Sequence, residues 1–149
     1  MELQDFILVP QCDDGTLTGF LSTFMAMVTT AAAENNRPLD CVRRYKEWMQ
    51  DAGFESVEEK TFRLPQNVWP GPGQQPPYKE IGAWVLQMFL EWVEGLSMAL
   101  CTRVFGTEKL TVMESCRRVK EDLKNRRIHA YFKLSARPLP NSTQKPQQC

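Results

Sequence analysis

The sequence has no surplus of charge of either sign. Eighteen Lys and Arg balance eighteen Asp and Glu, so the formal net charge is zero. Proteins that bind nucleic acid or anionic lipid usually present a strong basic field, so this balance argues against both kinds of partner. Disordered chains combine high net charge with few apolar residues, whereas 42% of this chain is hydrophobic. We therefore expect a folded protein with no nucleic-acid or membrane partner.

Metal-binding and targeting signals are also missing. The chain has five cysteines and one histidine, and no two cysteines have the C-x-x-C spacing of zinc sites. We therefore predict that the chain has no metal site. We also predict that its cysteines are reduced, as is usual inside cells. Residues 1–15 lack the regions of a signal peptide, and Glu91 and Glu94 interrupt the longest apolar stretch, at 83–100. The sequence predicts a soluble cytoplasmic protein, with a nuclear location as an alternative.

No catalytic motif is present. The chain has no P-loop, no G-x-S-x-G and no H-E-x-x-H, and Gly71 and Gly73 lack the third glycine of a dinucleotide fingerprint. His129, the only histidine, is the one candidate for a general base, although a structural role in a strand is favoured. Asp13 and Asp14 are interpreted as turn residues in preference to an acid–base or metal-binding pair.

Hydropathy patterns predict the element order β-α-α-β-loop-α-α-β. Alternating or short apolar runs predict strands at 1–9, 54–64 and 128–136. Apolar residues at spacings of three and four predict helices at 17–34, 41–52, 78–104 and from Thr107 onward.

A proline-rich loop follows the second predicted strand. Half of the ten prolines fall between positions 65 and 77, which excludes a helix and disfavours a central strand there. Trp69, Trp84 and Trp92 follow in and after this loop. They are candidates for lining a pocket for a planar or hydrophobic ligand, with core packing as the alternative.

Several segments, in order, resemble the C-terminal half of fungal class I S-adenosylmethionine-dependent methyltransferases of the LaeA-like group. They are ELQDF with CDDGTL, KEWMQDAGFESVEEKTFRLP, WPGP with YKEIGAW, GLSMAL, TRVFG and NRRIHAYF. The resemblance implies an α/β fold: a partial Rossmann-like methyltransferase fold, with a three-stranded remnant of a mixed sheet and a helical lid insertion. The three predicted strands would be the family's fifth, sixth and seventh, the seventh running antiparallel between the other two.

The same resemblance implies a division of the chain. Residues 1–136 would form the C-terminal part of a methyltransferase-like domain, with the lid insertion at about 66–126, and residues 137–149 a disordered tail. The implied cofactor is S-adenosylmethionine, but nothing here matches the family's glycine-rich loop or its ribose-binding acidic residue. No cofactor-binding residue is therefore assigned, and we do not expect this chain alone to bind the methyl donor.

The missing elements affect the expected partners and activity. The first strand would be an exposed edge of the sheet. This suggests a truncated gene model or a split protein. The expected partner at that edge is a second copy of the chain or a complementing protein. The main prediction is a methyltransferase of fungal secondary metabolism that acts on a small hydrophobic metabolite and is incomplete on its own. One alternative is a donor-site-deficient cyclase or isomerase with His129 or Tyr131 as acid or base. The other is a non-catalytic interaction module.

Overall fold

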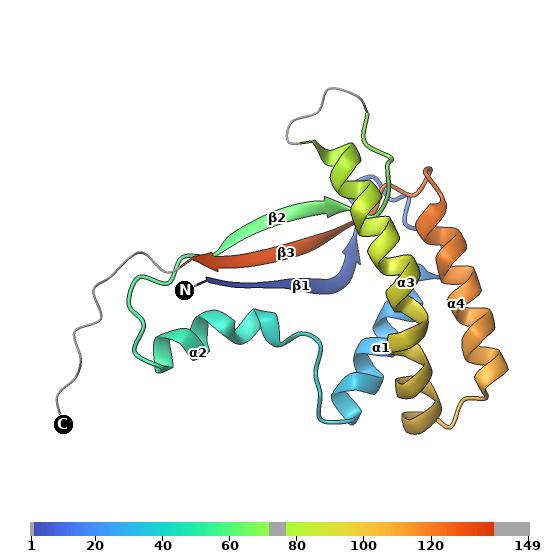
Figure 1. The fold of residues 1–149 in the computed structure, drawn as a ribbon, viewed down its shortest axis with the longest axis horizontal. Coiled ribbons are helices and arrows are strands. Elements are labelled where there is room, and N and C mark those ends of the chain that lie inside the picture. The colour runs from blue at the N-terminus through green and yellow to red at the C-terminus, as the bar shows by residue number, and fades with distance from the viewer. Residues whose placement is uncertain (1, 72–76, 139–149) are drawn as a thin grey trace.

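The structure, a computed structural model, describes residues 2–71 and 77–138. The strands of this part are β1 (Glu2–Gln11), β2 (Lys60–Pro65) and β3 (Tyr131–Pro138), and they form one sheet in the order β1-β3-β2. β3 pairs antiparallel with both neighbours, so β1 and β2 run in the same direction on either side of it (Figure 1). The predicted α/β fold and the antiparallel central strand are confirmed, although both strand pairs are antiparallel rather than mixed.

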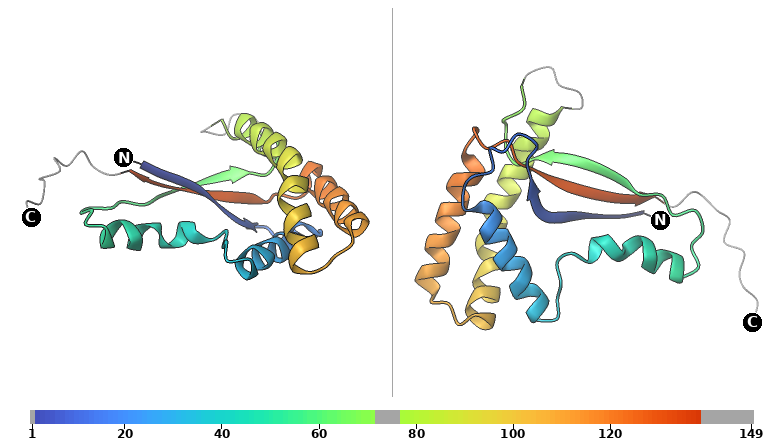
Figure 2. Two further views of the ribbon diagram at one scale, coloured as in Figure 1. Left: turned by 60° about the horizontal axis from the view of Figure 1, so that its bottom comes forward. Right: turned by 180° about the vertical axis from the view of Figure 1, so that it is seen from behind.

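The described helices are α1 (Leu21–Glu34), α2 (Tyr45–Asp51), α3 (Tyr78–Val104) and α4 (Lys109–Lys124), and a short 3-10 turn, η1 (Cys41–Arg44), leads into α2. α2 and α3 are followed by Gly53 and Gly106, both at positive φ, a conformation that glycine adopts without steric cost. Helices α1, α3 and α4 lie together at the end of the sheet where β1 and β2 finish, and α2 runs below the other end (Figure 1 and Figure 2).

The core joins this group of three helices to the sheet. Phe89 of α3 stacks on Phe132 of β3 with ring centroids 4.3 Å apart, and it meets Phe6 of β1 edge-on at 6.5 Å. The remaining core side chains from α1 and α4 repeat at helical spacing: Leu21, Phe24, Met25, Val28, Val112, Cys116, Val119 and Leu123. Burial of each large apolar side chain contributes about 1.5–3 kcal/mol.

One side of α3 faces this core. It is made of Gly82, Val85, Phe89, Val93, Ser97 and Cys101. Trp84 lies off this side and is 78% exposed. Apolar residues of α3 occupy more than one side of the helix, so hydropathy alone does not determine which side is buried.

The loop after β2 is fixed by two polar side chains that are fully buried, Gln66 and Asn67. Asn67 Nδ2 donates to the carbonyl oxygens of Leu123 and Asn125 at 2.8 and 3.1 Å. These contacts satisfy carbonyl groups at the end of α4, which have no partner within the helix. Asn67 Oδ1 accepts the Trp69 backbone N–H at 2.9 Å, so the same side chain also positions the residues that follow it.

The predicted boundary of the disordered tail at 137 is wrong. β3 continues through Pro138, and Arg137 is 1% exposed. Its guanidinium donates to the Val42 carbonyl oxygen and to Glu59 Oε1, both at 2.6 Å. The buried charge is therefore paired, and Arg137 connects β3 to the segment around α2. Residues 139–149 lie outside the described residues.

Two further properties concern the described residues as a whole. No helix within 2–71 and 77–138 has the length and hydropathy needed to cross a membrane. The same ranges contain no group of three or more His, Cys, Asp or Glu side chains that could hold a metal ion.

Candidate functional site

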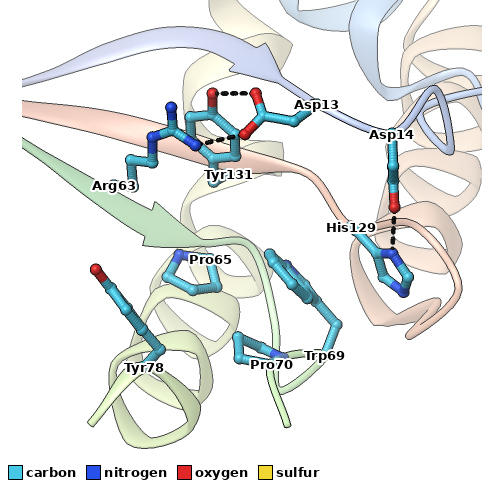
Figure 3. Close-up of a pocket in the computed structure, with 9 residues that line it drawn as sticks. All are labelled: Asp13, Asp14, Arg63, Pro65, Trp69, Pro70, Tyr78, His129 and Tyr131. Carbon is cyan, nitrogen blue, oxygen red and sulfur yellow. Dashed lines mark hydrogen bonds and ion pairs between the residues drawn. The ribbon is translucent and has the colours of Figure 1, made fainter. Parts of the chain in front are cut away.

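A cavity of about 280 Å³ lies where β1 and β2 end and β3 begins (Figure 3). Because β3 runs antiparallel between two parallel neighbours, its first residues meet the last residues of both. Ligands of open α/β folds usually bind at this carboxyl edge of the strands. The lining residues are Asp13, Asp14, Arg63, Pro65, Trp69, Pro70, Tyr78, His129 and Tyr131.

His129 and Asp14 form a hydrogen-bonded pair in the cavity. His129 Nδ1 lies 2.6 Å from Asp14 Oδ2, and the two side chains are 39% and 46% exposed. An ionised carboxylate only accepts hydrogen bonds, so Nδ1 carries the hydrogen and Nε2 of the neutral ring keeps a lone pair. Trp69 packs against the imidazole with ring centroids 5.0 Å apart. The ring is thus oriented from two sides, with its basic nitrogen directed away from Asp14.

The turn after β1 holds Asp14 in place. Asp14 Oδ1 accepts hydrogen bonds from the Cys12 thiol at 2.9 Å and from the Thr16 hydroxyl at 2.8 Å. The bonds from Cys12, His129 and Thr16 lower the pKa of Asp14 well below its ordinary value of 3.8. The Thr16 hydroxyl also accepts the His129 backbone N–H at 2.8 Å. This short turn therefore supplies the partner of His129 and also attaches to its backbone.

A second polar group lies beside the first. The Tyr131 hydroxyl donates to Asp13 Oδ1 at 2.9 Å, and Arg63 pairs with Asp13 Oδ2. The Arg63 guanidinium stands 4.7 Å above the Tyr131 ring. The hydrogen bond from Tyr131 lowers the pKa of Asp13, while burial and the bond to Asp13 raise the pKa of Tyr131. Asp13 therefore stays ionised and Tyr131 protonated near neutral pH.

The rest of the cavity wall is apolar and comes from the fixed loop after β2. Pro65 and Pro70 are buried, and Trp69 is half-buried. The Trp69 indole N–H donates to the Ala130 carbonyl oxygen at 2.9 Å, which fixes the ring across the start of β3. Tyr78, the first residue of α3, lies opposite these side chains (Figure 3).

The structure separates the three tryptophans that the sequence grouped. Trp69 lines this cavity together with His129. Trp92 lines a different cavity of about 360 Å³, beside Phe6 and Leu8 of β1. Trp84 is 78% exposed and lines neither of them. The idea that all three surround one pocket is therefore wrong, because they leave α3 and its preceding loop in different directions.

Sequence reasoning missed most of the polar members of the site. Asp13 and Asp14 do form a turn, as predicted, but Asp13 also binds side chains of β2 and β3, and Asp14 also binds His129, just before β3. Arg63 and Tyr78 carried no signal, since an isolated Arg in a strand or Tyr at a helix start is common on protein surfaces. The alternating pattern of the strand predicted at 128–136 did place His129 and Tyr131 on one face, and both line the cavity, although β3 begins only at Tyr131.

The comparisons with known proteins point to one group. The probable methyltransferase tdiE of Emericella nidulans is 32% identical over 134 residues, covering 89% of this chain and 41% of its own length. The methyltransferase pytC of Aspergillus terreus is 31% identical over 89% of this chain and 40% of its own length. The protein-methionine methyltransferase laeA of E. nidulans is 31% identical over 82% of this chain and 32% of its own.

These similarities cover part of each relative. The chain spans only about a third to two fifths of the length of these relatives. No protein-family model matches the chain, and no solved structure matches it either.

Proposed function

The chain belongs to the fungal LaeA-like methyltransferases, as a homologue of part of their length, and from this we propose that it supplies the methyl-acceptor site of such an enzyme. The proposed reaction is methylation of a small hydrophobic metabolite in fungal secondary metabolism. The proposed site is the cavity at the carboxyl edge of β1 and β2.

The pairing of His129 with Asp14 carries this proposal. The 2.6 Å bond to Asp14 fixes the ring and leaves Nε2 as a base. A hydroxyl or amine on the acceptor would donate its proton to Nε2, and Asp14 would stabilise the imidazolium that forms. A correctly positioned general base typically contributes a factor of about 10²–10⁴ to the rate.

S-adenosylmethionine is the methyl donor that the family implies, but the described residues do not fit it. A nucleoside site at the end of a strand needs a glycine-rich turn for close backbone approach and a free carboxylate for the ribose. The turn after β1 has the single glycine Gly15, and both of its carboxylates are already engaged. Asp13 binds Arg63 and Tyr131, and Asp14 binds His129. We propose that residues other than those described hold the donor.

The outer edge of β1 is the proposed contact for that donor-binding part. In the described sheet β1 has one neighbour, β3, and it extends over ten residues. Val9 is 43% exposed on this strand. The run at 6–9 makes the middle of β1 apolar, as in strands that pair on both sides, whereas the shorter β2 carries Lys60 and Arg63. A complementing strand at β1 would leave the cavity at the strand end accessible.

A complementation experiment in the producing fungus tests the acceptor site. The gene is deleted and replaced by the wild type, by His129→Gln, or by the control Lys109→Gln, whose side chain is exposed at the start of α4. Metabolite extracts are compared by mass spectrometry. We expect the deletion and the His129→Gln strain to lack a methylated product, and the wild type and the Lys109→Gln strain to form it.

Other outcomes would support the other functions. Accumulation of an unconverted isomer of the same mass in the His129→Gln strain would instead support a cyclase or isomerase. A deletion strain with an unchanged metabolite profile would contradict both enzymatic functions. Protein levels measured by immunoblot exclude the trivial explanation that His129→Gln does not accumulate.

A further inference from the structure

Three hydrogen-bonding groups in the cavity have no partner within residues 2–71 and 77–138. They are Nε2 of His129, the hydroxyl of Tyr78 and the guanidinium N–H groups of Arg63 other than the one bonded to Asp13. The other polar side-chain atoms of the cavity, on Asp13, Asp14, Trp69 and Tyr131, are hydrogen-bonded within the described residues. A bound molecule would therefore meet one basic nitrogen, one cationic donor and one hydroxyl.

The walls between these groups restrict the shape and size of the bound molecule. Pro65, Pro70 and the Trp69 ring are flat or rigid surfaces, and the Tyr131 ring is 5% exposed beneath Arg63. The volume of about 280 Å³ is slightly below the roughly 300 Å³ at which pockets begin to hold drug-sized ligands. A compound of one or two planar rings fits this space.

The charges of the lining residues restrict the class further. Asp13 and Asp14 each contribute −1 and Arg63 contributes +1, so the cavity carries −1 when His129 is neutral. This charge disfavours an anionic ligand. Arg63 still requires an acceptor atom, because a guanidinium has donors only. A neutral carbonyl oxygen meets both conditions.

We propose that the methyl acceptor is a neutral hydroxyaryl ketone, whose hydroxyl donates to Nε2 of His129 and whose carbonyl oxygen accepts from Arg63. This inference rests on the proposed function of the cavity as an acceptor site. Trp69 and the prolines contact the faces of the ring. Tyr78 supplies a further donor at the mouth of the cavity.

Binding to the full chain, without any methyl donor, tests the proposal. The probes are para-hydroxyacetophenone, its anionic counterpart para-hydroxybenzoate, and acetophenone, which lacks the hydroxyl. His129 is the only histidine, so the imidazole signals in a nuclear magnetic resonance titration belong to it alone. We expect para-hydroxyacetophenone to shift these signals and to bind about tenfold more tightly than acetophenone, which lacks the hydrogen bond to His129. We expect a similar preference over para-hydroxybenzoate, whose negative charge adds to the net −1 of the cavity.

Two arginine variants identify the carbonyl partner. Arg63→Gln should weaken para-hydroxyacetophenone binding about tenfold. Because the cavity then carries −2, para-hydroxybenzoate should bind still more weakly than it binds the wild type. Arg44→Gln is the matched control, because Arg44 also stands over an aromatic ring, Trp48 at 5.0 Å, and also pairs with a carboxylate, Glu47 at 3.5 Å, but outside the cavity. It should bind all three probes as the wild type does.

The proposal is overturned if para-hydroxybenzoate binds as tightly as the ketone, if Arg63→Gln leaves ketone binding unchanged, or if no probe moves the His129 signals. Loss of the methylated product in the His129→Gln strain, together with no ketone binding, would reject only the substrate class. Ketone binding with an unchanged His129→Gln metabolite profile would reject the acceptor role and retain the binding site.

Discussion

Gly82 lies where α3 crosses the loop that carries Trp69 into the cavity. A Cβ atom at this position would stand 2.1 Å from the Asn67 carbonyl oxygen. Gly95, further along the same helix, has no atom within 4 Å of the corresponding point. We predict that Gly82→Ala destabilises the protein and displaces Trp69, whereas Gly95→Ala stabilises it slightly.

The magnitude follows from the contacts of Asn67. The carbonyl would have to move by about 1 Å or more to reach an ordinary separation. Asn67 is fully buried and makes three hydrogen bonds, to Leu123, Asn125 and Trp69, that oppose the movement. Overpacking of this kind costs about 1–3 kcal/mol, and the better helix propensity of alanine returns about 1 kcal/mol. We expect a net loss of about 1 kcal/mol, and at most about 2 kcal/mol, for Gly82→Ala and a gain of up to about 1 kcal/mol for Gly95→Ala.

Thermal unfolding followed by circular dichroism measures the difference. For a chain of this size, 1 kcal/mol corresponds to about 2–4 °C, so Tm should fall by about 2–4 °C, and at most about 8 °C, in Gly82→Ala and rise by up to about 4 °C in Gly95→Ala. The indole N–H signal of Trp69 should shift in Gly82→Ala only. Equal Tm values for the two variants, or an unmoved Trp69 signal, would refute the close approach of α3 to this loop.

Three further predictions concern charge and the methyl donor. Arg137→Met should lower the free energy of unfolding by about 2–3 kcal/mol in urea denaturation, because it removes the guanidinium that bonds both the Val42 carbonyl and Glu59. A neutral effect, like that expected for the exposed control Arg126→Met, would show that Arg137 is not part of the fold. The lowered pKa of Asp14 means that its bonds stabilise the fold above its ordinary pKa of 3.8 and are lost as the pH falls toward the lowered value. The stability difference between wild type and Asp14→Asn should therefore be constant above about pH 5 and shrink below about pH 4, while Asp40→Asn, which removes an exposed carboxylate elsewhere, should show no such trend. Titration calorimetry of the full chain with S-adenosylmethionine should give no binding heat, and tight binding would contradict our account of the donor site.

Long elements with clear end signals were predictable from the sequence. The helix predicted at 78–104 is α3, with the same bounds, because a proline precedes it and Gly106 follows it. The strand predicted at 54–64 is shorter, since β2 begins only at Lys60. Ser56 has a positive φ, which breaks the extended conformation that the alternating pattern suggested.

The site was harder to predict because its contacts connect distant positions. His129 and Asp14 are 115 residues apart in the sequence. Their contact depends on the order β1-β3-β2, which local patterns do not encode and which the family resemblance implied. Trp84 shows that closeness in sequence can also mislead. It follows the loop closely in the sequence, but its position on α3 leaves it exposed to solvent.

The strand directions explain how the described residues can build the proposed acceptor site. β1 and β2 deliver Asp13, Asp14 and Trp69 just beyond their carboxyl ends. The antiparallel β3 starts at that same edge, so its first residues bring His129 and Tyr131 to meet them. Every described contact that orients His129 comes from within this chain, through Asp14, Thr16 and Trp69. The donor-binding part proposed for the outer edge of β1 would therefore meet a histidine whose ring is already oriented.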